Sequence, residues 1–72
     1  MKEQFDTLAA AREFADKQYY DGFLYVVKDE TMGTKNCGKY YVMSHNALNT
    51  YTNRYLNLHV IEEWDCSLRP NV

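Results

Sequence analysis

The N-terminal part of the chain has a hydrophobic pattern with the spacing of an α-helix. Its apolar positions fall on one side of a helical wheel: Leu8, Ala11, Phe14, Ala15 and Tyr19. Asp6 or Thr7 can cap the first turn by accepting a hydrogen bond from a free backbone N–H, and Gly22 allows a turn after the last. The pattern therefore predicts an amphipathic helix over residues 6–19 with one buried face.

Three later segments have the composition or the alternation of β-strands. Residues 23–29 and 39–44 are rich in β-branched and aromatic side chains. Because only about eight residues with loop-forming glycines connect these two segments, we expect an antiparallel hairpin and not a parallel crossover. Apolar and polar side chains then alternate from Leu56 onward, which predicts a third strand over residues 56–64.

The segment between the second and third strands has a mixed pattern. Four of its side chains are at helical spacing: Ala47, Leu48, Tyr51 and Tyr55. Three asparagines and two threonines in the same segment disfavour a helix interior. For residues 45–55 the expectation is a short helical turn inside a long loop.

These elements predict a small α+β fold with a single domain over residues 1–72. The N-terminal amphipathic helix is expected to pack on a three-stranded, antiparallel sheet, in the chain order α-β-β-short turn-β. A chain of 72 residues is too short to divide into two hydrophobic cores. Residues 67–72 are expected to form a flexible tail, because Pro70 cannot continue a strand ladder.

Both faces of the predicted sheet are apolar, although one helix can cover only one of them. Side chains alternate along a strand, so residues 23–27 and 40–43 each present apolar groups to both sides. Strands of this kind usually lie between two layers. Three candidates could supply the second layer: the 45–55 segment folded back, a second copy of the chain as a homodimer, or another protein.

Aromatic residues are more numerous than one small core needs, at 15% of the chain, and seven of them are tyrosines. Tyr, Trp, Met and Arg are enriched at the centres of protein interfaces, because they bury a large area and keep a polar group for the partner. The predicted partner-binding residues are Tyr25, Tyr40, Tyr41, Met43, Tyr51, Arg54, Tyr55 and Trp64.

The charge pattern makes nucleic acid a less favoured partner than protein. The formal net charge is −2, and no basic stripe is present. Sheet-based RNA binders nevertheless use exposed rings as stacking platforms. Tyr25 and Tyr41, with Lys39 and Arg54 nearby, therefore keep open the alternative of a module that binds single-stranded nucleic acid.

Few residues of the sequence are candidates for metal binding or catalysis. Cys37, Cys66, His45 and His59 are of the types that bind zinc, but their spacing fits no structural zinc signature. Cys37 and His45 could also act as nucleophile and base, yet Cys37 is predicted in a hairpin loop, where a rigid catalytic site is hard to build. We therefore expect no catalytic residues, no metal site and no cofactor.

Two further features favour a cytoplasmic protein of a bacterial cell or host. The N-terminal residues lack the apolar stretch of a signal peptide, and no window is apolar enough to span a membrane, so no membrane partner is expected. Two cysteines are fewer than the four to eight of a typical secreted disulfide scaffold, which favours reduced thiols.

Together these observations predict a small, non-enzymatic protein-binding module. In size and make-up the chain resembles the small accessory proteins of phages and mobile elements, which often inhibit a host enzyme by occlusion. The resemblance implies that the aromatic sheet face inhibits or modulates a host protein.

Overall fold

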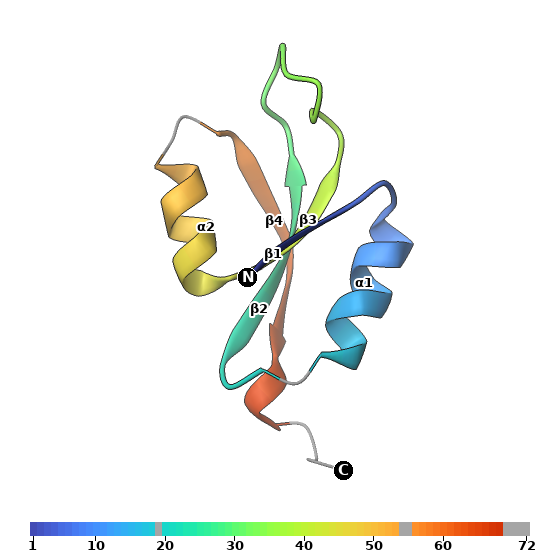
Figure 1. The fold of residues 1–72 in the computed structure, drawn as a ribbon, viewed down its shortest axis with the longest axis vertical. Helices are drawn as coiled ribbons and strands as arrows, with labels where there is room; N and C mark the ends of the chain where they lie inside the picture. The colour runs from blue at the N-terminus through green and yellow to red at the C-terminus, as the bar shows by residue number, and fades with distance from the viewer. Residues whose placement is uncertain (19, 54–55, 69–72) are drawn as a thin grey trace.

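The computed structural model describes residues 1–18, 20–53 and 56–68, which form a four-stranded antiparallel sheet between two helices (Figure 1). In chain order the elements are β1 (Lys2–Phe5), α1 (Leu8–Lys17), β2 (Phe23–Asp29), β3 (Tyr40–Ser44), α2 (His45–Thr52), β4 (Leu58–Asp65) and a 3₁₀ turn (Cys66–Leu68). The sheet order is β1-β3-β2-β4. The predicted α+β class, the packing of a helix on the sheet and the β2–β3 hairpin are confirmed.

The two helices lie on opposite faces of the sheet, and the strand order explains why. Helix α1 connects β1 to β2, which are parallel to each other with β3 between them; α2 connects β3 to β4 across β2 in the same way. Both connections advance in the same direction across the sheet, but they start from strands that run in opposite directions. Connections of the same right-handed sense must then pass over opposite faces.

The α1 face of the sheet contains the first half of the core. Thr7 caps α1 by accepting a hydrogen bond from the backbone N–H of Ala10 at 3.1 Å. The buried residues of this face come from the helix, the two central strands and the last turn: Ala11, Ala15, Leu24, Val26, Val42 and Cys66. The two alanines allow the helix to approach the sheet closely. The observed helix is two residues shorter at each end than the predicted one.

The α2 face contains the second half of the core, and here the structure differs from the expectation of a short turn in a loop. Ser44 caps an eight-residue helix by accepting a hydrogen bond from the N–H of Ala47 at 3.3 Å. This helix packs on β2 and β3 over the buried side chains of Val27, Tyr41 and Met43. Residues 45–52 are thus the second layer, as in the fold-back alternative.

A β-bulge in β4 changes which side chains reach each face. Val26 pairs with Glu62, and Val27 pairs with Val60, so Ile61 is an additional residue on the β4 side. Before the bulge, Val60 lies on the α2 face. After the bulge, Trp64 packs in the α1 cluster, whereas an uninterrupted alternation would have placed it on the same face as Val60.

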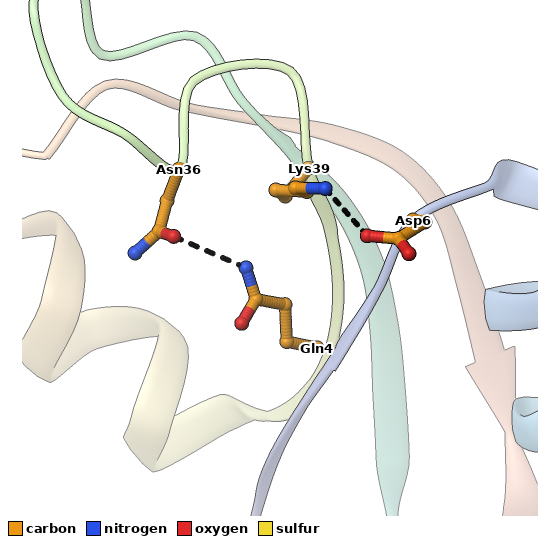
Figure 2. Close-up of polar contacts among 4 residues, drawn as sticks. All are labelled: Gln4, Asp6, Asn36 and Lys39. Carbon is orange, nitrogen blue, oxygen red and sulfur yellow. Dashed lines mark hydrogen bonds and ion pairs between the residues drawn. The ribbon is translucent and has the colours of Figure 1, made fainter.

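The predicted count of three strands is wrong, because the N-terminal segment forms a fourth strand. Its side chains are polar and exposed except for that of Phe5, which gives β1 little sequence signal. Figure 2 shows how β1 and the residue after it are attached to the 30–39 loop: Gln4 donates a hydrogen bond to Asn36, and Lys39 forms an ion pair with Asp6.

Other element boundaries also differ from the predicted ones. The third predicted strand begins at Leu58, two residues later than expected. The first two residues of the expected tail belong to a 3₁₀ turn that begins at Cys66, and its last residues, 69–72, lie outside the described residues. Neither helix of the described ranges is long and apolar enough to cross a membrane.

Candidate functional site

The predicted partner-binding residues do not form one surface. Tyr41 and Met43 are core residues, 6% and 1% exposed, and half-buried Tyr51 of α2 packs against them. Tyr40 and Trp64 pack on the opposite side of the sheet, against the α1 cluster. The aromatic face that was expected to be open is therefore covered by the chain itself, because α2 folds back over it.

Of the three remaining predicted residues, the structure describes only Tyr25. Tyr25 lies on the α2 face, half-buried at the border of the cluster beneath α2. Arg54 and Tyr55 lie outside the described residues.

The residues around Tyr41 make its ring inaccessible to an external ligand. The Lys2 ammonium lies 5.5 Å from the centre of the Tyr41 ring and 4.2 Å from that of Tyr51, within cation–π range of both. Burial of the phenol, with a smaller contribution from the negative charge of Asp29, raises the pKa of Tyr41 above its ordinary value. The phenol is therefore uncharged at physiological pH.

An aromatic row remains accessible beside α2. Phe23 is 45% exposed, and its ring centre lies 6.4 Å from that of Tyr25. The Tyr25 ring lies 6.1 Å from that of His45, the first residue of α2. Figure 1 shows the start of β2 and the end of β4 below the first turn of α2, where the helix no longer covers the sheet.

Two carboxylates flank this row on the neighbouring strand. The β2–β4 register places Asp65 opposite Phe23 and Glu63 opposite Tyr25, so all four side chains lie on the α2 face. Side chains in directly opposite positions have Cβ atoms roughly 5 Å apart. Val60, 38% exposed, lies on the same face nearer to the bulge. We call Phe23, Tyr25, Val60, Glu63 and Asp65 the aromatic–acidic strip.

The carboxylates of the strip have no cationic partner among the described residues. Glu63 makes no hydrogen bond or ion pair with any of them. Asp65 accepts hydrogen bonds from the backbone N–H and the hydroxyl of Ser67, which are neutral donors. On the other face, by contrast, Glu62 is paired with Arg12 of α1. The strip therefore presents two negative charges beside two aromatic rings.

The strip adjoins an open sheet edge. Strands β1 and β4 are the two edges of the sheet, and no residue of the described ranges pairs with the outer side of β4. An edge strand presents backbone N–H and C=O groups that a further strand can bind. Strand β4 has eight residues and is the longest edge of this sheet.

The 30–39 loop forms a separate surface at the opposite end of the molecule (Figure 1). Met32 is 87% exposed, and a shallow hollow of about 480 Å³ at the base of the loop is lined by Met32, Cys37 and Asn57, among others. Cys37 and Cys66 are both free thiols. The described residues contain no group of three or more His, Cys, Asp and Glu side chains that could hold a metal ion.

Sequence reasoning identified one ring of the strip, Tyr25, and missed the other members. Alternation along β2 places Phe23 on the same side as Tyr25, and this signal could have identified it. The acidic residues near Trp64 stand out in the sequence as a short cluster. Their position opposite the two rings depends on the bulge at Ile61, which has no sequence signature here.

Comparisons of this chain with protein-family models, with curated proteins and with solved structures found no match. The geometry of the aromatic–acidic strip is therefore the basis for a functional proposal.

Proposed function

We propose that this chain is a non-enzymatic protein-binding module that docks on its partner through the aromatic–acidic strip. The observation that carries the proposal is the exposure of Phe23 beside half-buried Tyr25, on a face where α2 covers the other large side chains. Exposed rings next to ordered backbone bury a large area at little entropic cost when a partner binds.

The chemistry of the strip favours a protein partner. Interface centres combine aromatic groups with polar groups at the rim, and here Glu63 and Asp65 border the two rings. A compact module of this size acts by occupying a surface of its partner. Inhibition of a host protein by occlusion, as in the small accessory proteins of phages, is the mode that we propose. Two free thiols support a reducing cytoplasm as its location.

The nucleic-acid alternative has less support from the same geometry. Tyr41, one of the two expected stacking platforms, is buried beneath α2. The other platform, Tyr25, has the Glu63 carboxylate opposite, which would repel a phosphate backbone. A protein partner is therefore the function that we propose.

Position-specific photo-crosslinking tests the proposal in a lysate of the source organism. The Phe23→p-benzoylphenylalanine variant keeps a ring on the strip and is expected to form a specific crosslink to one protein. The matched control carries the same group in place of Ala9, which is exposed on α1 at the opposite face. Circular dichroism of both variants establishes that they fold. A crosslink from the Ala9 position alone, or equal crosslinks from both, would contradict the proposed surface.

A further inference from the structure

We infer that the partner supplies an extended segment with arginine side chains, which pairs with the outer edge of β4 as a fifth strand. This inference rests on the proposed function and specifies the partner of the same strip. It follows from three observations: the open edge, the spacing of the carboxylates, and the rings beside them.

The first observation is the open edge. The outer side of β4 runs from Leu58 to Asp65 and is unpaired by any residue that the structure describes. Main-chain hydrogen bonds to such an edge provide affinity, and the side chains on each face provide specificity. A strand added there would place every second side chain on the α2 face, beside the strip.

The second observation is the spacing of the two carboxylates. Glu63 and Asp65 are two residues apart after the bulge, so both lie on the α2 face. Alternate residues of an added strand would lie directly opposite them. A segment with basic residues at positions i and i+2 therefore matches both negative charges at once.

The third observation is that each carboxylate has an aromatic ring on its inner side. Tyr25 lies next to Glu63, and Phe23 lies next to Asp65. A guanidinium can form a bidentate pair with a carboxylate and also stack on an aromatic ring, whereas an ammonium is a strongly hydrated point charge. The combination of carboxylate and ring selects arginine over lysine.

A second copy of the chain does not meet these requirements. Pairing of two β4 edges would bring Glu63 and Asp65 of both copies to one seam, and β4 carries no lysine or arginine to offset them. Like charges facing each other across a strand pair are destabilising. A basic segment of another protein has the complementary charge.

A designed peptide provides the test. The probe is the capped peptide acetyl-Thr-Val-Arg-Val-Arg-Val-Thr-amide, titrated into the ¹⁵N-labelled full chain and followed by NMR at low salt. We expect fast-exchange shifts confined to β4 and the start of β2, with interstrand contacts between the peptide and β4 backbones. Dissociation constants up to about 1 mM are within reach of the measurement.

Two changes to the peptide separate strand pairing from charge attraction. Methylation of alternate backbone amides removes the pairing and leaves the charge unchanged, and it should abolish binding. Replacement of both arginines with lysine should weaken binding about tenfold, because the bidentate pairs and the stacking are lost. Equal binding of the methylated peptide would overturn the fifth-strand inference.

Variants of the protein complete the test. Glu63→Gln should weaken peptide binding about tenfold, the size of one charge-assisted hydrogen bond. Glu3→Gln, on the exposed far edge, is the matched control and should leave it unchanged. If the Phe23 position crosslinks a partner but the arginine peptide fails to bind β4, this inference is wrong and the proposed function stands. A β4-paired dimer in sedimentation experiments would also overturn it.

Discussion

The Met43→Ala variant is expected to lose about 2–5 kcal/mol of the free energy of unfolding, because Met43 is 1% exposed in the cluster beneath α2. The loss combines the transfer of a large side chain out of the core with the cavity that remains. A domain of this size has a total stability of roughly 4–11 kcal/mol, so the variant should show a clear loss in urea unfolding.

Two other substitutions provide reference values for the loss of stability expected in Met43→Ala. Met32→Ala makes the same chemical change at a side chain that is 87% exposed, and it should alter stability by less than about 0.5 kcal/mol. Leu24→Ala, beneath α1, should cost about as much as Met43→Ala. If Met43→Ala loses as little stability as Met32→Ala, the α2 face is open in solution and α2 does not cover Met43.

The Ala15→Leu variant is expected to lose about 1–3 kcal/mol, because it adds three carbon atoms where α1 meets the sheet. Ala15 and Ala11 are both completely buried, one helical turn apart on the same face of α1. A larger side chain must push the helix from the sheet or adopt a strained rotamer. Thermal unfolding followed by circular dichroism measures the loss.

Ala9→Leu is the control for this variant, since Ala9 is exposed on the same helix. Leucine has nearly the helix propensity of alanine, so the exposed substitution should be close to neutral. Equal stabilities for the two leucine variants would show that α1 does not pack on the sheet through Ala15.

Strand alternation alone predicted how the core is divided. It separates Leu24 and Val26 from Tyr25 and Val27, and the structure places these pairs in the α1 and α2 clusters respectively. The pattern is reliable here because two central strands are buried on both faces. The requirement for a second layer followed from the same pattern, and α2 supplies it.

The helix α2 could not be predicted from its own residues with the same certainty. Asn46, Asn49 and Thr50 have low helix propensity, and an isolated helix of eight residues is marginal in water. The Ser44 cap and the packing of Leu48 on the Met43 cluster stabilise it in the folded chain. These are tertiary contacts, which local propensity does not contain.

The aromatic–acidic strip could not be predicted from the sequence, for a different reason. Its carboxylates reach the α2 face only because the bulge at Ile61 shifts the alternation of β4 by one residue. Without the bulge, Glu62 and Trp64 would lie on the face that Glu63 and Asp65 now occupy. One additional residue in an edge strand thus determines which chemistry lies beside Phe23.

The chain closes its own aromatic face with α2, and the strip is the part of that face that this closure leaves accessible. An isotope-filtered NOE experiment on a mixture of labelled and unlabelled chains tests it most directly, because it separates contacts within one molecule from contacts between two. Closure by α2 within one molecule predicts intramolecular NOEs from Tyr41 and Met43 to Ala47, Leu48 and Tyr51. Their absence, or their appearance only between labelled and unlabelled molecules, would contradict it.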